Sequence, residues 1–158
     1  MDDIFQKIAI NTYTVHDMAH RVRILRSYLE MQIFKKYVEA DQAPEDQAFI
    51  NSLGGEFLKQ FNSDNIAQIF EAVEKKISQI TPLVIYLPFE MPAQEIDRLG
   101  LNLRKDFGQN FFYEIKFDPD LIAGCALVWK GIYKDYSLRS TIAQKREEIL
   151  ESFKGHIK

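Results

Sequence analysis

Two histidines near the start of the chain have the type and spacing that could bind a metal ion. His16 and His20 lie in the segment His-Asp-Met-Ala-His, which has a helical pattern. Residues four apart on a helix share a face, so two such imidazoles could hold one zinc ion. The zinc-protease pattern has glutamate where this chain has Asp17, and no third ligand follows at a suitable spacing. We therefore predict no metal site.

Other catalytic patterns are missing from the sequence. Gly54-Gly55 is not followed by the lysine of a phosphate-binding loop, and it lies within a helical pattern. No pairing of a nucleophile with a base can be named. The sequence therefore predicts that the chain is not an enzyme and binds no cofactor.

The charge balance argues against nucleic acid as a partner. The 158 residues carry a formal net charge of -3, with an isoelectric point near 5.6. One predicted helix has a basic side, but acidic residues accompany it and follow closely, which is typical of a solvated face. The basic residues are His20, Arg21, Arg23, Arg26, Lys35 and Lys36, and the acidic ones are Glu30, Glu39, Asp41, Glu45 and Asp46.

The cellular setting is expected to be reducing and aqueous. Cys125 is the single cysteine, so no intramolecular disulfide can form, and we expect it to be a small buried apolar residue. No apolar run approaches the ~20 residues that span a membrane. The acidic start Met1-Asp2-Asp3 is unlike a signal peptide. We expect a soluble, cytoplasmic protein that does not insert into the membrane.

Helical periodicity predicts an N-terminal helical bundle over residues 1–81. A short helix is expected over residues 4–10, and three longer helices follow. A bend is expected at Gly54-Gly55, because glycine is a poor helix former, and Ser63 or Asp64 is expected to cap the third long helix. The predicted core positions are Met18, Val22, Leu25, Leu29, Ile33 and Tyr37 in the first long helix, Phe49, Leu53, Phe57 and Phe61 in the second, and Ile66, Ile69, Phe70, Val73, Ile77 and Ile80 in the third.

Short apolar runs bounded by proline and glycine predict a small C-terminal α/β domain with a mixed sheet over residues 82–158. Strands are expected at residues 83–87, 111–117, 125–129 and 132–134. One helix is expected after Pro92, and Ser137 is expected to cap a final helix. The residues expected to face the core are Ile96, Leu99, Leu103 and Phe107 in the first helix, Phe111, Tyr113, Ile115 and Phe117 in the second strand, and Leu138, Ile142, Ile149 and Phe153 in the final helix. The fold class is therefore α+β.

The segment after the second predicted strand has residues that build a turn. Asp118-Pro119 favours a turn out of the strand, because proline fixes φ and cannot donate to the ladder. Leu121 and Ile122 are expected to anchor that turn in the core. Gly124 is expected to have positive φ or to lie close to another backbone segment. The full structural motif is Asp118, Pro119, Leu121, Ile122, Gly124, Asp135, Ser137 and Arg139.

This motif carries a resemblance to a known family. Asp135 and Ser137 can bond free amides at a helix start, and Arg139 remains available for an ion pair. The order and spacing resemble the C-terminal signature of delta subunits of F-type ATP synthases, whose mitochondrial counterpart is the oligomycin-sensitivity-conferring protein. That signature is Asp-Pro-x-Leu-Ile-Gly-Gly, a hairpin, and Asp-Gly-Ser-x-Arg. Ala123 and Tyr136 replace family glycines, and Tyr136 disfavours a left-handed conformation.

The resemblance implies a non-catalytic subunit of the peripheral stalk, or stator, which serves proton-driven ATP synthesis. The helical domain would bind the N-terminal segments of the alpha subunits, and the α/β domain would bind the C-terminal helices of the b subunits. The protein would lie in the cytoplasm, peripheral on the inner face of the cell membrane. The alternatives are an E-like stalk subunit of a V-type or archaeal ATPase and a non-catalytic helical adaptor.

The resemblance is weak in the helical part. The family has a six-helix bundle there, whereas the shorter segment of this chain must be trimmed, rearranged or missing a helix. This segment has more apolar helix than a small bundle readily buries, so we expect a groove for a partner helix. Phe5, Ile8, Phe57 and Phe61 are candidate groove walls, and the simpler alternative places all four in the core.

Overall fold

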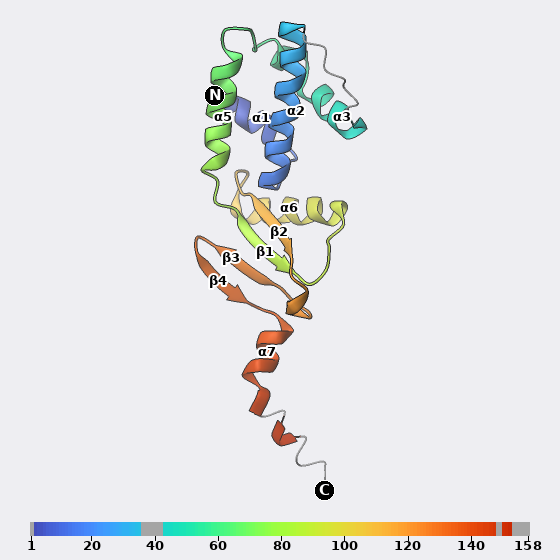
Figure 1. Ribbon diagram of the computed structural model, residues 1–158, viewed down its shortest axis with the longest axis vertical. Coiled ribbons are helices and arrows are strands. Elements are labelled where there is room, and N and C mark those ends of the chain that lie inside the picture. The colour runs from blue at the N-terminus through green and yellow to red at the C-terminus, as the bar shows by residue number, and fades with distance from the viewer. Residues whose placement is uncertain (1, 36–42, 148–149, 153–158) are drawn as a thin grey trace.

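The computed structural model describes residues 2–35, 43–147 and 150–152, in which a helical part lies at one end of a four-stranded sheet (Figure 1). This arrangement confirms the α+β class. The helices before the sheet are α1 (Asp2–Ala9), α2 (Val15–Phe34), α3 (Pro44–Leu53), α4 (Gly55–Leu58) and α5 (Ile66–Ser78). The later elements are β1 (Leu83–Leu87), α6 (Ala93–Phe107), β2 (Tyr113–Phe117), the 3₁₀ helix η1 (Pro119–Leu121), β3 (Ala126–Trp129), β4 (Ile132–Asp135) and α7 (Leu138–Gln144).

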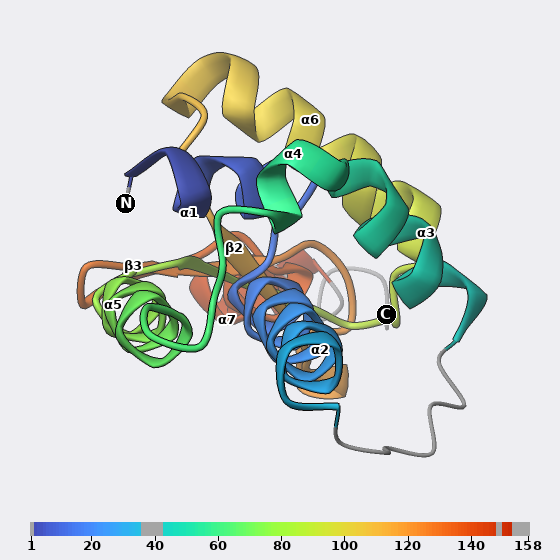
Figure 2. The same ribbon diagram turned by 90° about the horizontal axis from the view of Figure 1, so that it is seen from above.

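The helical part has one apolar core, and the predicted stripes supply most of it. α2 and α5 lie side by side and contact each other (Figure 2). The buried members of the stripes are Met18, Val22, Leu25, Leu29, Phe49, Leu53, Phe57, Phe61, Ile66, Phe70, Val73 and Ile77. Ile33, Ile69 and Ile80 are half-buried against this core, and Tyr37 lies outside the described residues. The helical periodicity is therefore confirmed where the structure describes it.

The connection from α3 to α5 has the predicted break but a different cap. Gly54 has a φ of 81° and separates α3 from α4, which confirms the bend. The predicted cap was wrong, because α5 begins at Ile66 with Asn65 as its N-cap. The side-chain oxygen of Asn62 accepts the N–H groups of Asp64 (2.9 Å) and Asn65 (3.0 Å). These bonds hold Ser63 and Asp64 in a turn before the helix.

The sheet has the strand order β2-β1-β3-β4, and it is mixed, as predicted. β1 and β2 are parallel, which requires a crossover, and α6 supplies that crossover and covers one face of the sheet (Figure 2). β3 and β4 form an antiparallel hairpin. Lys130 (φ 50°) and Gly131 (φ 79°) form its turn, and two positive φ values are what a tight hairpin turn requires.

Two aromatic residues expected in the core of the α/β part are exposed. Ile96, Leu99 and Leu103 do pack against the strands. Phe107, however, is 54% exposed, because it lies at the end of α6, where it stacks on Phe111. Phe117 is 56% exposed at the last position of β2. Phe111, Tyr113 and Ile115 do pack in the core cluster of the sheet, but burial does not alternate along β2, because Glu114 is also half-buried.

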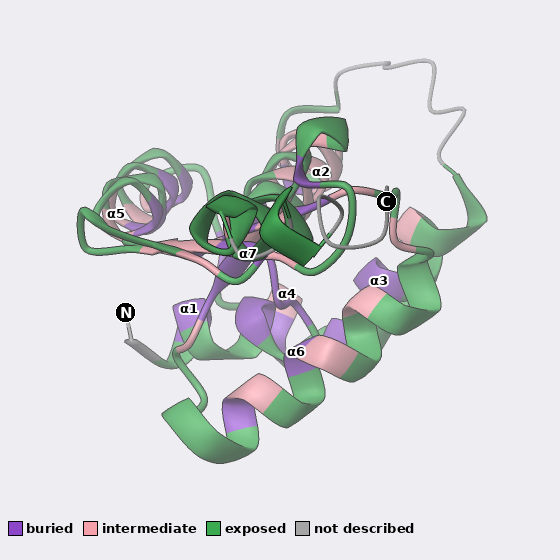
Figure 3. Cartoon of the chain, turned by 90° about the horizontal axis from the view of Figure 1, so that it is seen from below, coloured by how far each residue is buried: buried purple, intermediate pink, exposed green. Residues whose placement is uncertain are grey.

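The final helix does not pack inward as predicted. α7 projects away from the sheet (Figure 1), and none of its residues is buried (Figure 3). Leu138 and Ile142 are each 44% exposed. Ile149 and Phe153 lie outside the described residues. The sequence correctly indicated an apolar face on this helix. In the described structure that face is not covered by another element, and the sequence could not indicate this.

At the junction, each of the two parts of the chain contributes one aromatic residue to the core of the other part. Tyr13 precedes α2 but packs in the core cluster of the sheet, and Phe112 precedes β2 but packs in the helical core. The N–H of Tyr113 donates to the carbonyl of Tyr13 (3.1 Å), and Thr14 forms a parallel bridge with Tyr113. A domain boundary between residues 81 and 82 remains a prediction.

Arg104 of α6 joins the parts directly, and only 8% of it is exposed. Its guanidinium donates hydrogen bonds to the carbonyls of Ala9 (3.2 Å) and Thr12, between α1 and α2. It also lies 4.7 Å from the ring centroid of Tyr13 and 5.4 Å from that of Phe112. Burial lowers the pKa of Arg104, and no carboxylate of the described residues forms an ion pair with it. Carbonyl dipoles and aromatic faces therefore hold this charge.

We predict that Arg104→Lys destabilises the protein by about 2–4 kcal/mol, because a lysine cannot bridge several carbonyls in one plane. The measurement is a urea melt followed by circular dichroism. Lys105→Arg, at the neighbouring exposed position, is the control and should stay within about 0.5 kcal/mol of the parent. Equal midpoints for the two variants would show that the buried guanidinium does not hold the parts together.

Candidate partner-binding surfaces

The turn after β2 forms as the motif predicts. The carboxylate of Asp118 accepts the N–H of Asp120 (3.1 Å) and caps η1, whose first residue is Pro119. Leu121 is only 3% exposed and anchors the turn in the interior. This segment therefore gives the chain a fixed exit from the sheet.

Ile122 does not anchor the turn, and this part of the prediction was wrong. Its φ of 67° and ψ of -57° place it at the centre of a γ-turn, in which the N–H of Ala123 donates to the carbonyl of Leu121 (2.8 Å). The turn directs Leu121 inward and leaves Ile122 63% exposed. A β-branched residue with positive φ is strained, and such strain is concentrated at functional sites. Ile122 is therefore a candidate contact residue.

Gly124 allows the two halves of the motif to touch. It has a φ of 85°, and a Cβ built there would lie 2.4 Å from the carbonyl oxygen of Tyr136. Backbone hydrogen bonds close this contact, from Tyr136 to Cys125 (2.9 Å) and from Leu138 to Ala123 (2.8 Å). The prediction of positive φ or close approach is confirmed on both counts. Cys125 is half-buried in this junction, less than expected.

The second half of the motif caps α7 as predicted. The Ser137 hydroxyl accepts the N–H of Ser140 (3.2 Å), and Ser137 is 1% exposed. The carboxylate of Asp135 accepts the N–H of Ser137 (2.8 Å). Hydrogen bonds from Ser137 lower the pKa of Asp135, and the nearby charge of Arg139 acts in the same direction. Arg139 itself is exposed and forms no ion pair within the described part of the chain.

Large apolar side chains are exposed at the end of the molecule that carries α7. We call them the distal apolar surface, and they come from the end of β2, the turn after η1, strand β4 and α7 (Figure 1). Its members are Phe117 (56% exposed), Ile122 (63%), Tyr133 (57%), Tyr136 (58%), Leu138 (44%) and Ile142 (44%). Exposed apolar surface of this extent is typical of a protein-binding site.

A second candidate surface is a groove between α2 and α5. Its volume is about 370 Å³. Ala19, Val22 and Ile77 supply an apolar floor, and Arg23, Arg26, Glu74 and Ser78 complete its lining. Arg26 forms ion pairs with Glu30 (2.9 Å) and Glu74 (3.0 Å), so the rim carries charges of both signs. A groove of this kind suits an amphipathic helix.

The four residues proposed as groove walls lie elsewhere. The exposed fractions are 3% for Phe5, 0% for Ile8, 8% for Phe57 and 6% for Phe61. The rings of Phe57 and Phe61 pack edge to face with centroids 5.5 Å apart. All four belong to the helical core, which was the simpler alternative given in the sequence analysis. Partner binding by these residues remains a prediction, and in this conformation their side chains are not accessible.

Both ring nitrogens of His20, one of the two histidines, are occupied by protein contacts. Arg23 donates to Nδ1 of His20 (2.9 Å), so Nε2 carries the proton and donates to Asp46 (2.9 Å). Because both ring nitrogens of His20 form hydrogen bonds, this residue has no free lone pair for a metal. His16, one turn earlier, is exposed. No group of three or more candidate ligands that could hold a metal occurs within the residues that the structure describes.

Sequence reasoning missed Arg104 and the outward position of Ile122. The sequence did hold an indication that this face of α6 contacts another segment closely, because Gly100 lies one turn before Arg104 on the same face. A Cβ on Gly100 would lie 2.2 Å from Cγ of Tyr13, so this glycine lets the tyrosine ring approach the helix. For Ile122 the sequence held no signal, because an isoleucine after leucine normally indicates a buried position.

The fold and these surfaces define a class of protein: a binding module with an accessible apolar surface at one end and an apolar groove in its helical part. Comparison with known families gives the particular one. The model of the family described as ATP synthase delta (OSCP) subunit matches residues 19–149. The chain belongs to this family. A search of curated proteins returned no match.

Family membership gives the coarse function. The chain is a non-catalytic subunit of the peripheral stalk of ATP synthase, a complex that also contains alpha and b subunits. It is a peripheral part of a membrane-bound complex. No helix of the described residues is long and apolar enough to cross a membrane. The match favours the F-type interpretation over the E-like alternative.

We predict that Gly124→Ala lowers the free energy of unfolding by more than about 2 kcal/mol, since an added methyl would meet the backbone of Tyr136 and positive φ disfavours it. Urea melts measure the change. Gly55→Ala is the matched control, because Gly55 lies at the start of α4, where an added methyl would have no atom within 4 Å. It should be neutral or stabilise by up to about 1 kcal/mol. If the control were the more harmful change, the tight contact at Gly124 would not matter.

Proposed function

We propose that this chain links the alpha subunits of the catalytic head to the C-terminal helices of the b subunits. The helical part would bind alpha-subunit N-terminal segments, and the α/β part would bind b. The observation that carries this proposal is the distal apolar surface, which lies at the opposite end of the long axis from the helical part (Figure 1). A connector needs separate binding sites at separated positions.

The b-binding end is supported by the chemistry of the distal apolar surface. Ile122, Leu138 and Ile142 are aliphatic and exposed, and Tyr133 and Tyr136 add rings with polar tips. Interface hot spots combine such anchors with a surrounding polar rim. The leucine and isoleucine of α7 are four residues apart, the spacing at which one helix packs along another.

The alpha-binding end is supported by the groove between α2 and α5. Val22 is 2% exposed and Ile77 is 9% exposed, so the floor is fixed by the core beneath it. Arg23, Arg26 and Glu74 at the rim would favour a helix with charged side chains of both signs beside its apolar face. We propose this groove in place of the candidate groove walls Phe5, Ile8, Phe57 and Phe61, because their side chains are buried.

The proposed setting is the cytoplasmic side of the cell membrane, where the stalk runs beside the catalytic head. The mechanical task there is to resist the torque of the rotor during proton-driven ATP synthesis. That task requires slow dissociation from both partners and a rigid body between them, and it requires no reactive group.

For the b end, we predict that Leu138→Asp weakens binding of a peptide from the C-terminus of b by about tenfold or more, because an apolar anchor becomes charged. Calorimetric titration of the full chain measures it. The control is Ala93→Asp, also an exposed residue in the first turn of a helix, where an acid is tolerated. Unchanged binding by the Leu138 variant would remove the distal apolar surface from the proposal.

For the alpha end, we predict that Ala19→Glu weakens binding of an alpha-subunit N-terminal peptide by about tenfold, since the added carboxylate fills the groove. Binding of the b peptide should not change. Ala67→Glu is the control, because Ala67 is exposed on α5 and does not line the groove. Equal affinity of the two variants for the alpha peptide would exclude this groove as the site.

A further inference from the structure

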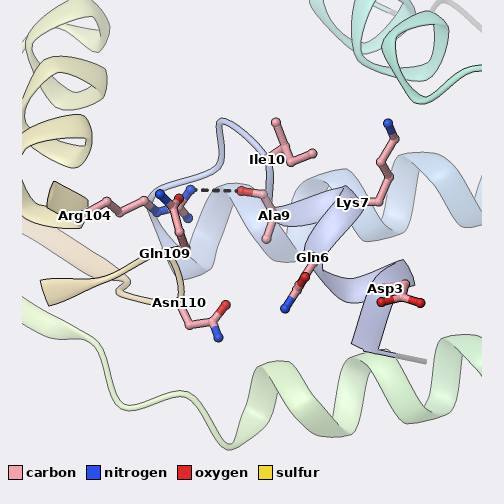
Figure 4. A pocket seen from close by; sticks show the side chains of 8 residues that line it. All are labelled: Asp3, Gln6, Lys7, Ala9, Ile10, Arg104, Gln109 and Asn110. Carbon is pink, nitrogen blue, oxygen red and sulfur yellow. Dashed lines mark hydrogen bonds between the residues drawn. The ribbon is translucent and has the colours of Figure 1, made fainter.

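A cavity of about 440 Å³ lies between α1 and the end of α6, away from both proposed partner sites. It is lined by Asp3, Gln6, Lys7, Ala9, Ile10, Arg104, Gln109 and Asn110. Figure 4 shows that α1 supplies one wall and that Arg104, Gln109 and Asn110 supply the other. The lining therefore combines two cations, one acid and three side-chain amides.

The charge of Arg104 faces this cavity without a carboxylate partner in the described residues. Hydrogen bonds to the carbonyls of Ala9, Thr12 and Phe111 use three of its five N–H groups. The rings of Tyr13 and Phe112 cover the guanidinium, so its remaining donors lie in the plane between them. Two N–H groups thus remain for a ligand that can accept both.

We propose that this cavity binds a small oxyanion of the phosphate class, with Arg104 as its central donor. The planar guanidinium matches two oxygens of one phosphate group, and hydrogen bonds between two charged groups are stronger than those between neutral ones. Gln6, Gln109 and Asn110 can donate amide hydrogens to the other oxygens. The Lys7 side chain extends away from Arg104 in Figure 4, so Arg104 supplies the main positive charge.

Other ligand classes fit this lining less well. A cation would meet the charges of Arg104 and Lys7, and among the described lining residues Asp3 is the one acid that could bind it. An apolar ligand would leave the two remaining N–H groups of Arg104 and the side-chain amides without acceptors in the pocket. The inference is independent of the proposed stalk function, because no lining residue belongs to the distal apolar surface or to the groove between α2 and α5.

The test is thermal unfolding of the full chain in increasing inorganic phosphate, with chloride adjusted so that ionic strength stays constant. A ligand that binds only the folded state raises the Tm along a saturable curve. Calorimetric titration gives the Kd, and amide chemical shifts of Gln6, Gln109 and Asn110 report the location. We expect saturable stabilisation and shifts confined to these amides and their neighbours.

Three variants separate this site from general charge effects. Asn110→Asp places a carboxylate in the cavity, so phosphate binding should weaken at least about fivefold, while the Tm without phosphate should not fall. Asp3→Asn removes an acid of the described lining and should tighten binding about threefold. Lys105→Gln removes a positive charge outside the lining and should leave the Kd within about twofold.

Some results would overturn the proposal. A Tm that rises without saturation, or that rises equally with chloride alone at the same ionic strength, would show no specific site. Saturable binding that Asn110→Asp leaves intact, or that Lys105→Gln weakens as much, would place the anion elsewhere. Both peptide titrations would be unaffected by any of these outcomes.

Discussion

The buried guanidinium of Arg104 is the contact on which the rest of the structure depends. It comes from α6 in the α/β part and bonds carbonyls between α1 and α2 in the helical part. Because Tyr13 and Phe112 enclose it from opposite parts of the chain, removing the charge would disturb both cores. A buried ion pair could be broken by a change of pH, whereas an arginine held by carbonyls and rings keeps its charge throughout the physiological range. The junction is therefore insensitive to pH.

The C-terminal motif has a different role, which is to fix the direction of the chain after the sheet. Leu121 lies inside, Ile122 is turned outward by the γ-turn, and Gly124 lets the two halves of the motif touch. The strained residue costs about 1–3 kcal/mol, and the buried leucine and the cap at Ser137 offset that cost. This arrangement leaves apolar side chains in water, which an isolated domain would not need. The proposed partner at this end would cover them.

The features of the fold that depend on hydrophobic periodicity could be predicted from the sequence. The stripes of α2, α3 and α5, the four strands and the cap at Ser137 follow from local pattern and were found. Leu138 and Ile142 were misplaced because an apolar helix face looks the same whether it is covered by the same chain or by another. Arg104 was missed because its role depends on carbonyls more than ninety positions away along the chain. Tertiary contact of this kind leaves little trace in a single sequence.

A subunit that resists torque must also transmit force between its ends. From the groove between α2 and α5, the path runs through the helical core to Arg104 and α6, and then into the sheet. The central strand β1 is bonded on both sides, to β2 and β3, so load that enters it is shared by two ladders. From β3 the force is transmitted through β4 to the motif. There, backbone hydrogen bonds join Tyr136 and Leu138 to the segment after η1. Because each step is a buried or hydrogen-bonded contact, the two proposed partner interfaces would be the weakest points of the path, and slow dissociation would have to be achieved there.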